Sequence, residues 1–420
     1  MIQTYKNLSA HIQDQGLFTE LARTLAKSFG RVTYSSPWID AFPSLKDTEI
    51  GEGTARFDRV EGIAEVREET DLFVFPDTYY GKDQVELVDA GKRVWGSRKA
   101  DELEIDRSDA KPYFDTLKIP QGPYEIVKGM SKLRKLLKSK GDAKVWVKVP
   151  GKDRGTVETF SVEGYELYKG QIDDLEFRLG PKAEIMVFVV EDHLKDTIDI
   201  AIDTHTVDGV WPSVALLGTE EKGELYIGVV KKWNEIDPNL VSIYDKLSDT
   251  LKKYECRNFI SLESRKKNKD VKLGDPCIRF GSPPGEAQMN MITNLPDLFW
   301  FGAEGKMVDP EYAAKYCIAL MVHSDWACKH PLMVEYPKKY REQIKFRYDS
   351  EFDGKTWIMP QDAGPRIAAI VAQGNTLEPL FEEVKEISEQ LRGIQIESFT
   401  RSIPIAREKL KTLASWGIRI

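Results

Sequence analysis

Residues 273–288 read Leu-Gly-Asp-Pro-Cys-Ile-Arg-Phe-Gly-Ser-Pro-Pro-Gly-Glu-Ala-Gln. This segment places an acid (Asp275), a thiol (Cys277) and a cation (Arg279) at alternate positions. In an extended strand, side chains two residues apart point to the same face, so these three would share one face. The pattern therefore predicts a strand that presents polar and charged groups to a site.

A second acid precedes this segment. Glu263 lies twelve residues before Asp275, and the polar run Arg265–Asp270 between them is suited to the tip of a hairpin. A hairpin would place the two acids on neighbouring strands, where they suit a Mg²⁺ ion that also holds nucleotide phosphates. Because like charges repel without a cation, we expect neutralisation of either acid to leave the ligand-free stability equal or higher. The alternative is an ordinary surface hairpin.

The end of the segment, Ile278–Gln288, resembles the signature of phosphoribosylamine–glycine ligases, which belong to the ATP-grasp superfamily. That signature reads acid-x-Asn-x-Arg-Phe-Gly-Asp-Pro-Glu-x-Gln, and its acid and Asn bind a metal. By this resemblance, Asp275 corresponds to the metal-binding acid and Arg279 to the Arg. The sequence departs from the signature at Cys277 in place of Asn, at Ser282 in place of Asp, and at the additional pair Pro284-Gly285 before Gln288.

The composition is that of an ordinary globular protein, with 41% hydrophobic and 30% charged residues. A length of 420 residues exceeds what one core supports and indicates several domains. The formal net charge of −8 gives no electrostatic basis for binding nucleic acid or a membrane. The four cysteines and five histidines lack metal-site spacing, and no signal-peptide core or long apolar run is present. We therefore expect a cytoplasmic protein.

The first hundred residues alternate between helical and extended patterns, which predicts a parallel sheet with crossover helices. In such sheets, ligands bind at the carboxyl ends of the strands. The related ligases begin with a Gly-rich phosphate-binding turn, whereas this chain has no Gly-x-Gly there, so a phosphate would have to be held differently. The expected elements are a helix over Leu17–Phe29, strands over Val32–Ser36 and Asp71–Asp77, a helix over Gln84–Ala90 and a candidate acceptor-binding loop over Asp77–Gly81.

Two segments supply candidate cations for the phosphates of a nucleotide. Leu103–Pro120 resembles the entry into the ATP-grasp region, and this resemblance places Arg107 and Lys111 at the positions of its two lysines. A capped surface helix is the alternative. In the segment 144–149, the alternation puts Lys148 on the face opposite three valines. In the related ligases, a strand lysine at this place contacts the phosphates, and a glycine-rich loop closes over them.

A third segment resembles the adenine hinge of ATP-grasp proteins. The strand Glu184–Leu194 is apolar and ends in acids. The resemblance implies that Glu191 and the backbone of His193 and Leu194 form the hinge. It also implies that Asp199 holds the ribose.

The resemblance implies a multidomain α/β protein with the ATP-grasp fold and an N-terminal parallel sheet. In the last third of the chain, we expect a helical or mixed segment over residues 310–320 and a helix capped by Asn375, with Glu378 three residues later. The expected domains are an N-terminal α/β domain over residues 1–105, an ATP-grasp core over 106–310 that includes a small lid over about 118–192, and a C-terminal domain over 311–420.

The implied function is that of an ATP-dependent carboxylate–amine ligase, as in purine biosynthesis, with ATP and Mg²⁺ as cofactors. Lys148 and Arg107 would neutralise phosphates, Asp275 with Glu263 would hold Mg²⁺, and Arg279 would orient the carboxylate, so that Lys148 and Arg279 are the candidate catalytic residues. The expected partners are a small carboxylate, such as glycine or another amino acid, and an amine, in a monomer or homodimer. Two alternatives remain: an amino-acid or peptide ligase on the same fold, and a non-catalytic nucleotide-binding protein.

Overall fold

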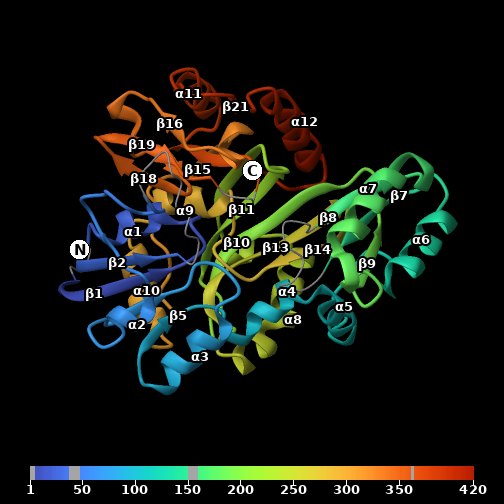
Figure 1. The fold of residues 1–420 in the computed structure, drawn as a ribbon, viewed down its shortest axis with the longest axis horizontal. Helices are drawn as coiled ribbons and strands as arrows, with labels where there is room; N and C mark the ends of the chain where they lie inside the picture. Colours follow the sequence, from blue (N-terminus) through green and yellow to red (C-terminus); the bar gives the residue numbers. More distant parts are fainter. Residues whose placement is uncertain (1–4, 37–47, 150–158, 361–363) are drawn as a thin grey trace.

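The computed structural model describes residues 5–36, 48–149, 159–360 and 364–420. Within these residues the strands form four sheets, and helices pack against them. Figure 1 shows a body that contains the N-terminal and C-terminal parts of the chain, and a smaller part, described below as the lid, at one end of the long axis.

The N-terminal part is a parallel sheet with the strand order β3-β2-β1-β4-β5, as the alternating pattern predicts. The helix expected over Leu17–Phe29 is shorter, because Phe29 opens a strand, where its ring stacks on Tyr5 with the centroids 4.9 Å apart. The elements are β1 (Tyr5–Gln13), α1 (Thr19–Leu25), β2 (Phe29–Ser35), β3 (Asp58–Arg59), α2 (Ile63–Val66), β4 (Leu72–Val74), α3 (Gly81–Asp89) and β5 (Arg93–Trp95).

Two short helices connect this sheet to the lid: α4 (Glu102–Ile105) and α5 (Arg107–Thr116). We define the lid as residues 124–192. It contains an antiparallel sheet with the strand order β6-β9-β7-β8 and two helices that cover one face of it. The lid elements are β6 (Tyr124–Lys128), α6 (Met130–Ser139), β7 (Lys144–Lys148), β8 (Thr159–Glu163), α7 (Tyr165–Leu179) and β9 (Val187–Asp192).

The largest sheet is antiparallel, with the strand order β14-β13-β10-β11-β12-β15-β20-β17, and β21 pairs with β15. The expectation of helical or mixed structure over residues 310–320 is wrong for its second half, because β15 begins at Tyr316. Residues 317–322 of β15 are fully buried, as is usual for an apolar run in a central strand. The strands are β10 (Ile198–Val207), β11 (Val214–Glu221), β12 (Leu225–Lys232), β13 (Arg257–Lys267), β14 (Asp270–Cys277), β15 (Tyr316–Ser324), β17 (Ile344–Phe346), β20 (Arg366–Gly374) and β21 (Ile396–Ser398).

A three-stranded sheet and several helices complete the body. Asn375 does not cap α11: its side chain accepts a hydrogen bond from the backbone N–H of Lys315, and Leu377 immediately precedes the helix. The sheet has the order β16-β19-β18, and the elements are α8 (Pro238–Lys253), α9 (Pro284–Met291), α10 (Leu295–Ala303), β16 (Leu332–Val334), β18 (Asp349–Phe352), β19 (Lys355–Ile358), α11 (Glu378–Ser388) and α12 (Ser402–Ser415).

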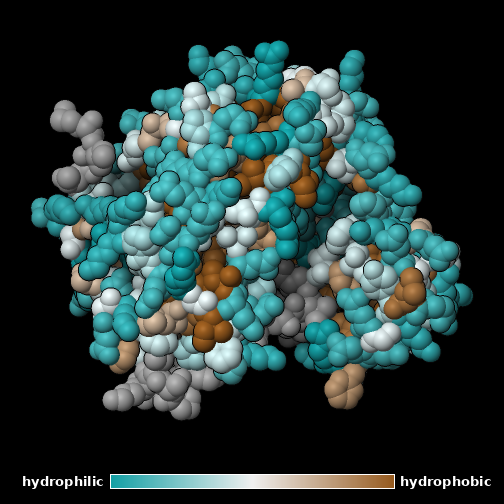
Figure 2. Space-filling model, turned by 90° about the horizontal axis from the view of Figure 1, so that it is seen from above, coloured by the Kyte–Doolittle hydropathy of each residue, from teal (hydrophilic) through white to brown (hydrophobic). Residues whose placement is uncertain are grey.

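The face shown in Figure 2 is mostly hydrophilic, and a hollow separates the lid from the body there. Four of the exposed large apolar side chains, Ile126, Leu167, Phe177 and Ile185, belong to the lid. In the described part of the chain, no helix combines the length and the apolar character that crossing a membrane requires.

Candidate nucleotide and metal site

The predicted hairpin is present. β13 and β14 pair in antiparallel register, and Glu263 lies directly opposite Asp275. The register shifts immediately after Glu263, where Ser264 pairs with Leu273. The two acids are therefore cross-strand neighbours, as the polar run between them predicts.

Two cations from distant segments meet at Asp275. The Nε of Arg107, at the start of α5, lies 3.1 Å from Oδ1 of Asp275, and its Nη2 lies 3.3 Å from Oδ2. The Nζ of Lys148, at the end of β7 in the lid, lies 3.5 Å from the same Oδ1. Burial alone would raise the pKa of Asp275, but Arg107 and Lys148 outweigh burial and hold this pKa well below its usual range. Asp275 is therefore firmly ionised at neutral pH.

A second acid lies between two lysines. Oε1 of Glu191, on β9, is 3.1 Å from the Nζ of Lys111 and 3.0 Å from the Nζ of Lys148. Lys111 belongs to the first turns of α5, which Asp106 caps by accepting the N–H of Asp109. Lys111 and Lys148 are both buried, and burial lowers the pKa of Lys111. The alternative of a capped surface helix therefore does not hold for this side chain.

The expectation that Glu263 and Asp275 repel each other is wrong. The Nζ of Lys222, just after β11, lies 2.6 Å from Oε2 of Glu263, so each acid has its own cation. Asp199, the predicted ribose acid, forms an ion pair with Arg265 directly opposite it on β13. Arg265 was not predicted as a site residue, because its pairing with Asp199 depends on the strand register.

Arg279 connects the end of the hairpin to the N-terminal part. Its Nη1 lies 2.8 Å from Oδ1 of Asp77, in the loop predicted to bind the acceptor, and its Nε lies 2.9 Å from Oε1 of Glu104. Glu104 also accepts the backbone N–H of Ile278, at 2.8 Å. No pattern in the sequence indicated Glu104, although it lies in the segment that contains Arg107.

The backbone of the predicted hinge is partly engaged within the lid. The N–H of His193 donates to the carbonyl oxygen of Lys144, and its Nδ1 accepts a hydrogen bond from the indole N–H of Trp146. The side chain of Leu194 packs against Gly122. The residues that follow Val149, where the related ligases have their glycine-rich loop, lie outside the described residues.

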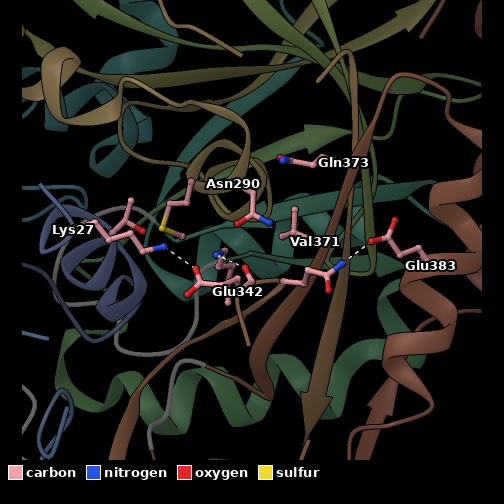
Figure 3. A pocket seen from close by; sticks show the side chains of 10 residues that line it. Lys27, Asn290, Glu342, Val371, Gln373 and Glu383 are labelled. Atoms are coloured by element: carbon pink, nitrogen blue, oxygen red, sulfur yellow. Dashed lines mark hydrogen bonds and ion pairs between the residues drawn. The ribbon is translucent and has the colours of Figure 1, made fainter. Parts of the chain in front are cut away.

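A small cavity adjoins the hairpin, and the side chains of Asp199, Glu220, Glu263, Cys277 and Ser282 are among those that line it. A second cavity, of about 360 Å³, lies between α1, α9, β17 and α11 (Figure 3). No predicted site residue lines this second cavity. Some of its polar residues pair with one another, as in the hydrogen bonds from Lys27 to Glu342 and from Gln343 to Glu383. Of the predicted site residues, Asp199 and Glu263 line the smaller cavity.

No family model and no curated protein sequence matches this chain. Several solved structures, however, match this chain in fold. Phosphoribosylamine–glycine ligase from Thermotoga maritima has a TM-score of 0.69 at 18% identity, with 93% of this chain and 99% of that chain covered. The biotin carboxylase domain of 2-oxoglutarate carboxylase from Hydrogenobacter thermophilus has a TM-score of 0.66 at 12% identity, with 95% of this chain and 92% of that chain covered. N5-carboxyaminoimidazole ribonucleotide synthetase from Thermus thermophilus has a TM-score of 0.60 at 13% identity, with 91% of this chain and 98% of that chain covered. The chain has the ATP-grasp fold.

Asp275 and Glu263, the two acids predicted to bind a metal, are cross-strand neighbours in this fold. Among the described residues, no group of three or more His, Cys, Asp or Glu side chains could hold a metal ion alone. Mg²⁺ does not require such a group, because it commonly binds one or two carboxylates together with phosphate oxygens. The two cross-strand carboxylates therefore fit a Mg²⁺–nucleotide complex better than a free metal ion.

We expect Cys277→Asn to preserve or increase Mg²⁺-dependent ADP release. Burial raises the pKa of the Cys277 thiol well above its ordinary value, so the group is neutral, and thiols suit soft metals rather than Mg²⁺. Steady-state assays of Cys277→Asn and Cys277→Ser, with melting curves for folding, check this expectation. Cys317→Asn, at a fully buried position, is the control and should destabilise the protein. Loss of activity in both folded Cys277 variants would assign the thiol a role.

Proposed function

We propose that this protein is an ATP-dependent carboxylate–amine ligase that acts through an acyl phosphate. The observation that carries the proposal is the convergence of three buried cations, Arg107, Lys111 and Lys148, on Asp275 and Glu191. Burial of several cations is costly unless anions compensate for them. Asp275 and Glu191 supply two negative charges against three positive ones, and nucleotide phosphates would supply the rest. A structure similar in fold, the biotin carboxylase domain from Hydrogenobacter thermophilus, was determined with MgADP and bicarbonate.

The proposed roles follow from position. Lys111, Lys148 and Arg107 bind the phosphates, and Asp275 with Glu263 would hold Mg²⁺, which would neutralise phosphate charge. Arg279, which forms ion pairs with Asp77 and Glu104, orients the carboxylate. The lid keeps water from the reactive acyl phosphate. Glu191, the backbone of His193 and Leu194, and Asp199 remain the predicted contacts for the nucleoside.

The chemistry needs no enzyme nucleophile. A carboxylate oxygen attacks the γ-phosphorus of ATP and ADP leaves. The amine nitrogen then attacks the carbonyl carbon, and phosphate leaves with the electron pair of the broken C–O bond. The protein contributes alignment and charge stabilisation.

A screen of ADP release tests the proposal. Candidate carboxylates, with and without amines, are added to the protein with Mg²⁺ and ATP, and ADP is measured. Release that a carboxylate stimulates supports the ligase, whereas ATP binding without any stimulated release supports the alternative of a non-catalytic nucleotide-binding protein. An amino-acid or peptide ligase is the second alternative within the same class, favoured by the missing Gly-rich turn.

We expect Lys148→Ala to weaken ATP binding by about 1.5–3 kcal/mol, or roughly 10-fold to 150-fold, while the protein stays folded. The substitution removes a cation that lies 7% exposed, opposite the buried Val145, Val147 and Val149. Titration calorimetry with ATP measures the effect. Lys144→Ala, four residues earlier in β7, is the matched control and should leave the affinity unchanged. Equal ATP affinity in wild type and folded Lys148→Ala would remove Lys148 from the site.

A further inference from the structure

The larger cavity, between α1, α9, β17 and α11, has no part in the proposed chemistry (Figure 3). Its volume of about 360 Å³ is within the range typical of sites for small molecules, roughly 300–1,000 Å³. Apart from Met289 and Val371, the residues that line it carry polar or charged side chains. The cavity therefore suits a polar ligand rather than an apolar one.

The lining of this cavity includes a buried cation. Lys345, on β17, is 4% exposed, and its Nζ donates to the carbonyl oxygen of Glu342 at 2.7 Å. Among the described residues, no carboxylate lies within ion-pair distance of this Nζ. Burial lowers the pKa of Lys345 to about 8, and the more distant charges of Glu20 and Glu342 offset this effect only in part. Lys345 is therefore mostly protonated at neutral pH and has no paired acid in the described structure to compensate for its burial.

The two acids that line the cavity are engaged by other groups. The exposed carboxylate of Glu342 lies 2.7 Å from the Nζ of Lys27. Glu383, on α11, accepts a hydrogen bond from the side-chain amide of Gln343 at 2.5 Å. Lys345 is therefore available to an anion that enters the cavity from solvent.

Neutral hydrogen-bonding groups line the same cavity. The side-chain amides of Asn290, at the end of α9, and Gln373, on β20, form no hydrogen bond with any described residue. In Figure 3 no dashed line reaches either of them. An amide donates through its nitrogen and accepts through its oxygen, so it can bind a hydroxyl group in either sense. The cavity thus combines one cation that lacks a paired acid with groups that suit hydroxyls.

We propose that this cavity is a binding site for a small hydroxylated carboxylate, whose carboxylate is bound by Lys345 and whose hydroxyl groups are bound by Asn290 and Gln373. A monocarboxylate fits better than a phosphate monoester, which carries about −1.5 to −2 charges at neutral pH. Lys345 supplies one positive charge, and the acids Glu342 and Glu383 line the same cavity. This inference goes beyond the proposed ligase function and does not depend on it.

The helix α9 contributes to both cavities, at its opposite ends. Ser282 and Pro284, where α9 begins, line the smaller cavity, whereas Met289 and Asn290 in its last turn line the larger one. At 1.5 Å per residue, the helix separates Pro284 from Asn290 by roughly 9 Å along its axis. A ligand in the larger cavity should therefore not displace a nucleotide from the smaller one.

Matched probes test the ligand class. Glycerate, glycerol 3-phosphate and glycerol are three-carbon polyols that carry a carboxylate, a phosphate or neither, and lactate and gluconate are a smaller and a larger hydroxylated carboxylate. Each is titrated by calorimetry, with and without Mg²⁺–AMP-PNP, into wild type, Lys345→Met, Asn290→Ala and Lys266→Met. Lys266 is the matched control, because it is 1% exposed, lies 2.7 Å from Oδ2 of Asp237 and does not line the cavity.

We expect at least one of the three carboxylates to bind wild type. It should bind Lys345→Met at least 10-fold more weakly and Asn290→Ala roughly 3-fold to 10-fold more weakly. Its Kd should be the same in Lys266→Met and in the presence of Mg²⁺–AMP-PNP. Absence of binding by all three carboxylates, an equal Kd in Lys345→Met and wild type, tighter binding of glycerol 3-phosphate than of glycerate, or competition with the nucleotide would overturn the inference.

Melting temperatures without ligand distinguish a binding role of Lys345 from a structural one. Lys345→Met should melt no lower than wild type, because the substitution removes a buried charge that has no paired acid in the described structure. Lys266→Met should melt lower, because it breaks a buried ion pair. A lower melting temperature of Lys345→Met than of wild type would show that this lysine stabilises the fold, and it would overturn the inference.

Discussion

Asp275→Asn is expected to lower carboxylate-stimulated ADP release by about 100-fold or more. The substitution removes the charge that would hold Mg²⁺ and that positions Arg107 and Lys148, and loss of one preorganised electrostatic group typically costs roughly 100-fold to 1000-fold in rate. Glu263→Gln should lower ADP release less than Asp275→Asn does. The only cation paired with Glu263 in the described structure is Lys222, which is largely exposed.

The same variant should also be less stable without ligand. Replacing the carboxylate of Asp275 by an amide would leave Arg107 and Lys148, which are 8% and 7% exposed, without part of their counter-charge. We expect a loss of about 1–3 kcal/mol in the free energy of unfolding. This is less than the roughly 3–5 kcal/mol typical of a fully buried pair, because Asp275 is 27% exposed and Lys148 keeps Glu191.

The contribution of Asp275 to the free energy of unfolding depends on pH, and the direction of this dependence follows from the pKa of its carboxyl group. The pKa of Asp275 is lower in the folded protein than its ordinary 3.8, so the folded state binds fewer protons there than the unfolded state. The stability that Asp275 contributes is therefore complete at neutral pH and is lost as the pH falls below about 3.8.

Melting curves with and without Mg²⁺–ATP, compared with ADP release, check these expectations. Asp270→Asn, at the exposed start of the same strand β14, is the control and should change neither quantity. If Asp275→Asn keeps wild-type turnover, the metal assignment fails. If it melts at or above the wild-type temperature without ligand, the ion pairs with Arg107 and Lys148 do not stabilise the fold.

The local parts of this site could be predicted from the sequence because they depend on period and spacing. The alternation in residues 273–279 and the polar run 265–270 specify a hairpin, and the pairing of Glu263 with Asp275 follows from it. The alternating helices and strands of the first hundred residues likewise specify a parallel sheet. Each of these features involves residues that are close in the chain.

The long-range parts could not be obtained from local pattern. Arg107 is 168 residues from Asp275, and Arg279 is 202 residues from Asp77. Only the resemblance to ligases indicated that Arg107 belongs to the site, and it indicated no partner for it. The error about repulsion between the two acids had the same origin, because the hairpin alone does not reveal the cations that other segments supply.

Arg23→Met is expected to lower the free energy of unfolding by about 3–5 kcal/mol, the range observed when one member of a buried ion pair is removed. Arg23, on α1, is 4% exposed and lies 2.8 Å from Oδ2 of the completely buried Asp349 on β18. It also lies 2.9 Å from Oε1 of Glu20. Burial would raise the pKa of Asp349, and Arg23 is foremost among the groups that instead hold this pKa below its ordinary value. The substitution therefore leaves a buried charge without its main partner.

Urea denaturation followed by tryptophan fluorescence measures this loss. Arg31→Met is the control, because Arg31 is 46% exposed and its ion pair with Glu69 should contribute no more than about 1 kcal/mol. Combining Arg23→Met with Asp349→Asn should recover part of the loss, since the second change removes the uncompensated charge while an amide can still accept the hydrogen bond from Thr19. Equal midpoints for Arg23→Met and Arg31→Met, or a double variant less stable than Arg23→Met, would show that this ion pair does not hold α1 against β18.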